Sequence, residues 1–258
     1  MFEAHQQVVH PELPDLIGIL AGKFAGSIFG GYLSLFSSII YSLFVVLALS
    51  LLSYFAARKK MMVPGRLQCA LEILVGGMDD FVCGIIGPKG RKYTPFIGTL
   101  FIYILCMNLL GLIPFMKSPS SSWSNTLALA ICVFFYVQYT AFREMGFLGY
   151  IDHLLGKPRG VMAFSVFIPT MIFFIHVVSE LIRPISLSLR LRSNIWGDDM
   201  LLAVLAGFGL KGIPLLLFSM PLIILAAVVQ AAVFCLLTTV YLALAMSHEE
   251  EHKVKEAF

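Results

Sequence analysis

Continuous apolar runs are the feature that most limits what this 258-residue chain can fold into. Several of them hold few or no charges over the roughly 20 residues that a helix needs to cross a hydrocarbon core of about 30 Å. Hydrophobic residues form 59% of the chain and charged residues 13%, whereas soluble domains carry roughly 25% charged residues. Because the runs are continuous and not alternating, they favour helices over the strands of a barrel. The sequence therefore predicts an all-α integral membrane protein.

The remaining composition argues against several other classes. Five cysteines occur singly, without a CxxC pair or another metal-ligand spacing, so we interpret them as small buried apolar residues. A formal charge of +3 is too small to suggest nucleic acid as a partner. The N-terminus lacks the basic start, short apolar core and cleavage site of a signal peptide. No phosphate-binding loop, dinucleotide fingerprint or nucleophile elbow is found, so we expect no cofactor, no metal site and no covalent chemistry.

Polar stretches divide the apolar runs into the segments of a single membrane domain. We expect an exposed arm and glycine-spaced segment at 1–31, a crossing at 32–57, an amphipathic surface helix at 64–84, a transmembrane hairpin at 95–142, a long hairpin at 161–247 and a charged tail at 248–258. The polar stretch at 143–160 is expected to be another interfacial segment. Glycines at 18, 22, 26 and 30 would let a second helix approach closely, and a flexible lead-in is the alternative.

The distribution of lysine and arginine predicts the orientation. Seven of these residues lie between the first and second crossings and three lie at 143–160, whereas the intervening loop has only Lys117. By the positive-inside rule the basic loops are cytoplasmic. With five crossings, the multi-pass chain has its N-terminus outside and its C-terminus in the cytoplasm.

The first half of the long hairpin carries residues that are costly in lipid. A charge at the bilayer centre costs at least about 2.5–3.5 kcal/mol, so such groups pair or line a wet cavity. At 100° per residue, six polar residues share one helical stripe within about 80°. They are His176, Glu180, Arg183, Arg190, Asn194 and Asp198. A second face carries Ser188, Arg192 and Asp199, and Pro184 is a possible kink between the two halves.

Three readings of this stripe stay open from the residues alone. It can be structural, with arginines paired to acids. It can be the binding site of a secondary transporter, although the inverted repeats typical of that class are absent. It can also be an ion relay, in which acids, an imidazole and amides pass protons while an arginine blocks leakage. The second helix of the hairpin adds Gln230, which can face Arg190.

Five motifs resemble subunit a, the membrane stator of the rotary F-type ATP synthases, in its bacterial form. They are VPGRLQ at 63–68, GPKGRKYTPFIGTLF at 87–101, NLLGLIPF at 108–115, PISLSLRLRSN at 184–194 and VVQAAVFCLLTTVYLALA at 228–245. The resemblance runs from about residue 30 to the tail. It implies one upright helix, a surface helix, a transmembrane hairpin and two long tilted helices packed against a rotor ring.

The resemblance also implies a function. The chain would be a non-catalytic subunit that provides two proton half-channels and couples proton flow to ring rotation and ATP synthesis. Its partners would be a ring of small two-helix proton-carrying subunits (subunit c), peripheral stalk subunits (subunit b) and the lipid of a bacterial inner membrane. The alternatives are a non-rotary ion channel, a secondary transporter subunit and a purely structural membrane subunit.

Site residues follow from the resemblance position by position. Arg190 matches the arginine that faces the ring carboxylate and separates the half-channels. Its polar neighbours are Ser186, Asn194 and Gln230. Asp199 falls in the half-channel from the outer side, with Asp198 beside it. The inner half-channel is expected near His176, Ser179 and Glu180.

The sequence departs from the family pattern at several positions. Arg192 and Ser193 stand where phenylalanine and glycine are usual, and Asp198 stands where a small residue is usual. Ile223 occupies a position where some members have histidine or glutamate. We therefore predict that Arg192 and Asp198 or Asp199 compensate each other at the channel wall. Arg192 and Arg183 would tune the site rather than carry the ion.

Overall fold

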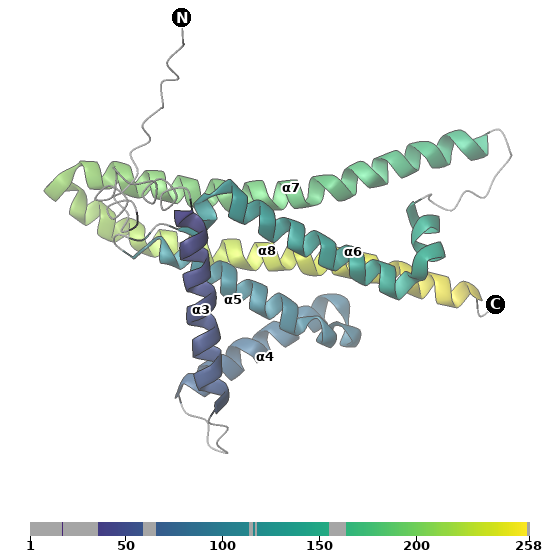
Figure 1. Ribbon diagram of the computed structural model, residues 1–258, viewed down its shortest axis with the longest axis horizontal. Coiled ribbons are helices and arrows are strands. Elements are labelled where there is room, and N and C mark those ends of the chain that lie inside the picture. Colours follow the sequence, from purple (N-terminus) through teal and green to yellow (C-terminus); the bar gives the residue numbers. More distant parts are fainter. Residues whose placement is uncertain are drawn as a thin grey trace, which may run out of the picture.

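The computed structural model describes residues 17, 36–58, 66–113, 116, 118–154 and 164–256, and most of them are helical. No strand occurs in these ranges (Figure 1). The long helices are α3 (Ser37–Arg58), α4 (Arg66–Ile86), α5 (Thr94–Leu110), α6 (Trp123–Leu154), α7 (Phe164–Gly207) and α8 (Ile213–Glu256). Short 3₁₀ helices η1 (Pro88–Lys92), η2 (Pro119–Ser121) and η3 (Gly209–Gly212) connect some of them. The glycine-spaced segment at 18–30 lies outside the described residues.

Four helices are long and apolar enough to cross a membrane, over Ser37–Phe55, Trp123–Glu144, Thr170–Gly207 and Ile213–Leu244. The 17-residue α5 is a shorter apolar helix between them. The predicted class, an all-α integral membrane protein, is confirmed. At 1.5 Å per residue, the 38-residue apolar part of α7 is about 57 Å long, nearly twice the thickness of a hydrocarbon core of about 30 Å. An upright α7 would project far beyond the core, so its length requires a steep tilt.

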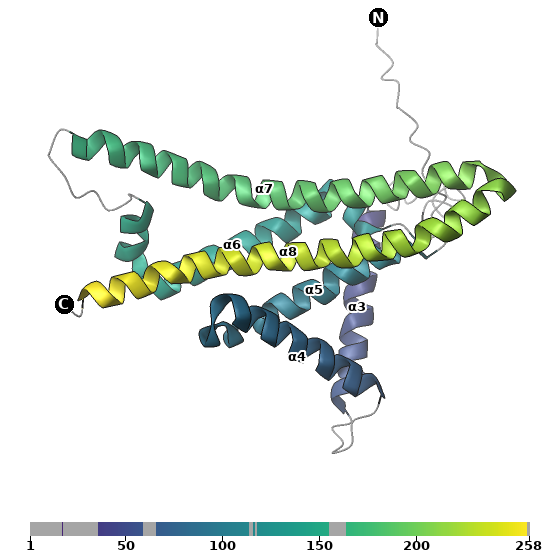
Figure 2. The ribbon, with the colours of Figure 1, turned by 180° about the vertical axis from the view of Figure 1, so that it is seen from behind.

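The arrangement of the helices is consistent with this tilt. Figure 1 shows α7 and α8 running along the long axis of the molecule, while α3 stands roughly across them. The reverse view in Figure 2 shows α7 and α8 in front of α6 and α5. Contacts join α6 to both α7 and α8, and α5 to α8. The polar stretch expected as a separate segment from 143 begins inside α6, whose last turns bend away from its main axis (Figure 1).

The main core lies where five helices meet. Its buried side chains include Val82 of α4, Ile97 of α5, Val133 of α6, Leu187 of α7 and Phe234 of α8. A second cluster between α3 and α5 contains Tyr41, Val45, Met107 and Leu110. Most other apolar side chains of α3, α7 and α8 face outward, as expected of helices that contact lipid or another subunit.

The turn between α7 and α8 depends on a close backbone approach. At Gly212 an added Cβ would lie 2.2 Å from the carbonyl oxygen of Leu205. Any larger residue would push the two helices apart at this end. Glycine at this position therefore allows the hairpin to close.

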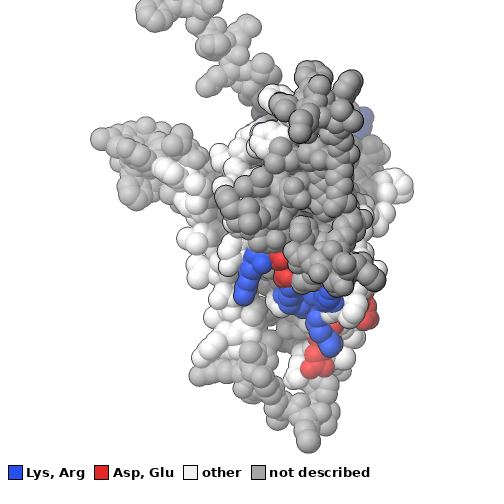
Figure 3. Space-filling model, turned by 90° about the vertical axis from the view of Figure 1, so that its right-hand side faces the viewer, with Lys and Arg blue, Asp and Glu red and all other residues white. Residues whose placement is uncertain are grey.

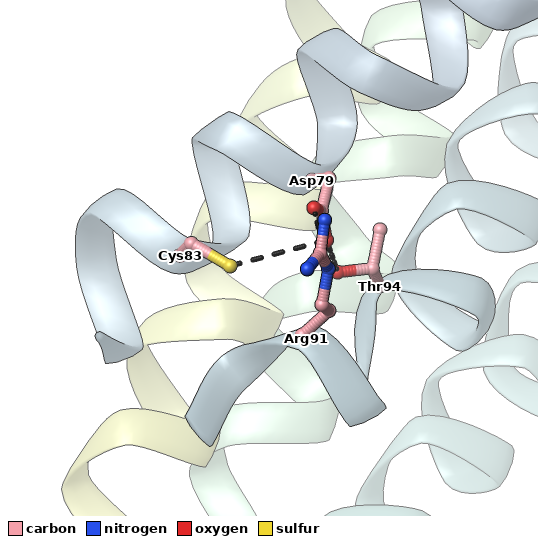
Figure 4. A network of polar contacts seen from close by, with 4 residues as sticks. All are labelled: Asp79, Cys83, Arg91 and Thr94. Atoms are coloured by element: carbon pink, nitrogen blue, oxygen red, sulfur yellow. Dashed lines mark hydrogen bonds and ion pairs between the residues drawn. The ribbon is translucent and has the colours of Figure 1, made fainter. Parts of the chain in front are cut away.

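A polar network joins α4 to the start of α5 (Figure 4). The carboxylate of Asp79 accepts hydrogen bonds from Arg91 Nε at 3.1 Å and from Thr94 Oγ1 at 2.8 Å. Cys83 Sγ donates a longer contact of 3.9 Å to the same carboxylate. Arg91 and Thr94 follow the end of α4 in the chain, so their bonds to Asp79 hold the amphipathic helix against the next span.

Surface charges of opposite sign are mixed on the side of the molecule shown in Figure 3. Ion pairs of the described residues join Arg91 to Asp79 and Lys92 to Glu144. The second pair links the end of η1 to α6. Both pairs lie beside the turn between α4 and α5, outside the candidate spans or at the end of one.

Candidate ion-translocation site

The three arginines of α7 have three different environments. Arg183 and Arg192 are partly buried, and each guanidinium stacks on an aromatic ring of a neighbouring helix. The Cζ atom of Arg183 is 5.0 Å from the ring centre of Tyr241, and that of Arg192 is 4.8 Å from the ring of Trp123. Arg190 is exposed, and no ion pair to it occurs among the described residues. Two arginines are thus held within the fold and one is presented outward.

Apolar packing explains why Arg190 points outward. One face of α7 is almost completely buried against the other helices, through Leu187, Ser188, Leu191 and Ile195. These positions recur at helical spacing, so the residues between them must turn away. The exposed residues of this part of α7 are Ser186, Leu189, Arg190, Ser193, Asn194, Trp196 and Gly197. The cation therefore lies on a face whose other side chains in this part of α7 are uncharged.

An amide pair connects α7 to α8 one turn beyond Arg190. Asn194 Nδ2 donates to Gln230 Oε1 at 2.7 Å. Gln230 is only 3% exposed, and its Nε2 finds no acceptor among the described residues. The expectation that Gln230 faces Arg190 is not matched by a direct hydrogen bond in this part of the chain. The glutamine contacts the arginine's neighbour instead.

A second polar cluster lies two turns before Arg190. Glu180 accepts from Arg183 Nη1 at 2.6 Å and from Gln138 Nε2 of α6 at 2.8 Å. A cavity of about 20 Å³ is lined by Glu180, Arg183 and Tyr241 among others, which is room for about one water molecule. The cluster therefore brings a carboxylate, an amide and a hydratable space together between α6, α7 and α8. Just before Glu180 on α7, His176 is partly buried and Ser179 is exposed.

The predicted polar stripe is divided by the packing of α7. Arg190 and Asn194 lie on the exposed face, whereas Glu180 and Arg183 contact α6 and α8. On the second predicted face, Ser188 Oγ donates to Thr126 Oγ1 at 3.5 Å and Arg192 Nε donates to the carbonyl oxygen of Ser121 at 3.4 Å. Asp198 and Asp199 follow further along α7 and are partly buried.

Arg192 forms no ion pair with Asp198 or Asp199 in the described part of the chain. Its contacts are with the corner where η2 meets α6. The compensation expected between this arginine and the aspartates stays a prediction about function, without a direct contact behind it. The arginine that departs from the family pattern at position 192 stacks on the ring of Trp123.

Sequence reasoning missed three residues that complete these clusters. Gln138 is an amide inside an apolar span, the same signal that drew attention to Gln230. Tyr241 and Trp123 provide the rings on which the two inner arginines stack. Stacking partners have no sequence signature, because any aromatic residue on a neighbouring helix can serve. The amide was detectable from the sequence and the rings were not.

The fold and site define a class of protein, a multi-pass helical membrane protein with an ionisable site on a long, tilted helical hairpin. The family model described as ATP synthase A chain matches residues 39–243. The ATP synthase subunit a of Protochlamydia amoebophila (strain UWE25) is 40% identical over 96% of this chain and 95% of its own length. Proteins of the same name from Solidesulfovibrio magneticus and Helicobacter acinonychis are each 38% identical, over 82% and 81% of this chain and 85% and 90% of their own lengths.

The chain belongs to the ATP synthase subunit a family, and the resemblance inferred from its motifs is confirmed. It is the stator subunit in the membrane sector of a rotary ATP synthase, where the family works together with subunits c and b. Proton transport for ATP synthesis is the activity of the assembly to which it contributes.

Proposed function

We propose that this chain provides two proton half-channels and that Arg190 couples proton flow to rotation of the carboxylate-bearing ring. The observation that carries this proposal is the contrast between the three arginines of α7. Two are paired or stacked within the fold, and the third is exposed on a face with no other charged side chain nearby on α7. A cation in lipid costs several kcal/mol unless an anion or water reaches it. The exposed face of α7 is therefore best satisfied by a partner that carries a membrane carboxylate.

Arginine suits the boundary between the half-channels because it remains protonated at any accessible pH. It can attract a ring carboxylate, yet it does not relay a proton itself. In the proposed cycle a proton enters from the outer side by Asp199, with Asp198 beside it, and neutralises a ring carboxylate. The neutral carboxyl then moves into lipid. The transmembrane potential adds about 2.3 kcal/mol per charge for each 100 mV.

The proton leaves by the inner half-channel after nearly a full turn of the ring. As the carboxyl approaches Arg190 from the other side, the cation favours its ionised form. Released protons pass towards His176, Ser179 and Glu180. The cavity beside Glu180, with room for about one water molecule, supports this exit route.

Three polar neighbours support the arginine's role. Ser186 and Asn194 lie one turn before and after Arg190 on the same exposed face. Gln230 holds Asn194 from α8. These uncharged groups can hydrate the path between the arginine and the aspartates without adding a competing charge.

We infer the orientation and location from the basic loops. Clusters of lysine and arginine between α3 and α5 and after α6 are assigned to the cytoplasm, which leaves the N-terminus outside. The membrane is taken to be the inner membrane of a bacterium, as the bacterial sources of the relatives suggest. Subunits c and b are the proposed direct partners.

The proposal is tested by Arg190→Ala in the assembled enzyme in membrane vesicles. We expect normal assembly and complete loss of ATP-driven proton pumping, followed with a pH-sensitive dye. Leu189→Ala is the matched control, because it truncates the adjacent exposed side chain without removing a charge. Pumping retained by Arg190→Ala would overturn the assignment of this arginine.

A further inference from the structure

Arg192 differs from Arg190 in being held at two points by one corner of the fold. Its Nε donates to the carbonyl oxygen of Ser121 at 3.4 Å, and its guanidinium lies 4.8 Å from the ring centre of Trp123. A guanidinium within about 6 Å of an indole ring is attracted by the ring quadrupole. Both partners belong to the junction of η2 with α6. The side chain therefore links α7 to one defined place.

That corner is itself fixed by hydrogen bonds from three helices. Ser38 of α3 donates to Ser122 Oγ at 2.6 Å, and Asn125 of α6 donates to the carbonyl oxygen of Pro119 at 3.3 Å. Ser118 Oγ donates to the carbonyl oxygen of Met107 of α5 at 2.9 Å. Because α3, α5 and α6 all hold it, the corner can resist a pull from α7. A contact to a mobile loop would not have this effect.

Helix geometry connects this contact to the exposed arginine. Residues 190 and 192 are about 200° apart around a helix axis. When Arg192 points towards the corner, Arg190 must point away from it. Ser188, one turn before Arg192, contacts Thr126 of α6 on the same side at 3.5 Å. Two polar contacts therefore hold one face of α7 inward.

The apolar contacts of α7 specify its rotation less strongly. Leu187, Leu191 and Ile195 are buried, but smooth aliphatic side chains can repack when a helix turns slightly. A hydrogen bond and a stacked guanidinium are lost over a small displacement, so they discriminate between rotations of the helix. The directional part of the α6–α7 contact thus lies in Arg192 and Ser188.

We propose that Arg192 is a positioning residue, whose contacts with Trp123 and Ser121 set the rotation of α7 that presents Arg190 to the ring. The inference rests on the proposed function of Arg190 for its effect on pumping, and on geometry alone for its effect on α7. It assigns the departure from the family pattern at position 192 to the placement of the helix. Arg192 itself carries no proton in this scheme.

The test combines a cross-link with a transport assay in the assembled enzyme. Ser188→Cys and Thr126→Cys are introduced together into a chain whose five native cysteines are replaced by alanine. The oxygen atoms of these two residues are 3.5 Å apart, so sulfur atoms in their place can reach the disulfide bond length of about 2.05 Å after a small adjustment. The rate of disulfide formation under mild oxidation then reports the rotation of α7.

We expect Arg192→Ala and Trp123→Leu to slow both disulfide formation and pumping per assembled enzyme. A misplacement of about 1 Å at a reacting group can cost up to about 100-fold in rate, so roughly a tenfold loss of pumping is expected. Trp123→Phe retains a ring for the guanidinium and should restore most of both readouts, whereas Arg192→Lys lacks the Nε donor and the planar group and should restore them only in part. A variant that combines Arg192→Ala with Trp123→Leu should be little worse than either single variant, because each of the two substitutions removes the same contact.

Two outcomes would overturn the inference. One is an unchanged cross-linking rate in Arg192→Ala, whatever happens to pumping, because α7 would then be placed without this contact. The other is an unchanged cross-linking rate in Trp123→Leu. If Arg192→Ala does not assemble, Trp123→Leu and Trp123→Phe decide in the same way. Pumping retained by Arg190→Ala would defeat the proposed function, whereas the cross-link would still test the position of α7.

Discussion

Asn194 and Gln230 join the two long helices by one amide–amide hydrogen bond of 2.7 Å. The asparagine is exposed and the glutamine is 3% exposed, so the bond runs from the open face of α7 into the interior of the hairpin. Gln230 Nε2, for which the described residues offer no acceptor, is left to bind water or an incoming group. The pair therefore fastens the hairpin and leaves one buried amide donor of Gln230 without an acceptor among the described residues.

Replacement of Gln230 by leucine should lower the stability of the α7–α8 hairpin and also reduce the rate of pumping. Interhelical hydrogen bonds in membrane proteins contribute about 0.6 kcal/mol on average and up to about 1.7 kcal/mol. We expect a lower thermal unfolding temperature for Gln230→Leu in detergent and a double-mutant coupling to Asn194→Leu within that range. Thr239→Val, which removes a buried hydroxyl of α8 that bonds within its own helix, is the control. Additive effects of the two amide substitutions would show that the hydrogen bond contributes nothing.

The cluster around Glu180 predicts a compensating pair of substitutions. Glu180→Gln keeps the shape of the side chain but leaves the partly buried Arg183 without its counter-charge. Breaking a buried ion pair from one side costs about 3–5 kcal/mol, and this pair is less buried, so we expect about 1–3 kcal/mol. The double variant Glu180→Gln, Arg183→Gln should recover part of that loss.

Unfolding of the four purified proteins in the cycle measures the coupling between Glu180 and Arg183. Gln138→Leu removes the second hydrogen bond to the carboxylate and tests its share separately. A double variant that is as unstable as the sum of both single variants would contradict the pairing. Pumping by Glu180→Gln, measured in vesicles, reports independently whether the carboxylate belongs to the inner path.

The fold was predictable because the bilayer leaves few choices. A candidate span of 38 residues has to tilt, and the polar residues between Arg66 and Ile86 predicted a helix at the surface. Arg190 was recognised through the motif around it. Its outward direction, however, depends on which side of α7 meets α6, and no pattern within α7 states that.

The predicted stripe did not separate Glu180 from Arg190 for a related reason. A regular turn of 100° per residue assumes a straight helix axis and ignores neighbouring helices, so it placed both residues on one face. In the structure Gln138 and Tyr241, on two other helices, draw Glu180 and Arg183 inward. Contacts between residues 40 or more positions apart decide the local environment, and a single sequence contains no direct record of them.

The network of Asp79 predicts the reactivity of Cys83. Partial burial and the nearby Asp79 carboxylate raise the pKa of this thiol above its usual range, and Arg91 opposes the effect. Because the thiolate is the nucleophile, a raised pKa means slow alkylation at neutral pH and a steep increase as the pH rises. Asp79→Asn removes the negative charge, which lowers the pKa and should accelerate alkylation at a fixed pH near 8.

Alkylation by iodoacetamide is measured on a chain in which Cys83 is the only cysteine. Glu72→Gln serves as the control, since it removes a charge from the same helix next to Gln68 and away from Cys83. We expect the control to leave the rate unchanged. Equal rates for the parent chain and Asp79→Asn would show that the carboxylate does not influence the thiol.

The contact of Lys92 with Glu144 predicts a loss of stability at alkaline pH. The hydrogen bond to Glu144 raises the pKa of Lys92, and burial raises the pKa of Tyr93 beside it. A folded-state pKa that lies above the unfolded value stabilises the fold at lower pH, and this contribution disappears as the pH rises through the folded value. Both groups act in the same direction, because the folded state holds the lysine charged and the tyrosine neutral. The unfolding temperature in detergent should therefore fall between about pH 10 and 11, where lysine and tyrosine ordinarily titrate. Lys92→Met should lower stability at pH 8 and flatten this decline, whereas Lys211→Met, at an exposed lysine of the α7–α8 turn, should leave the decline intact.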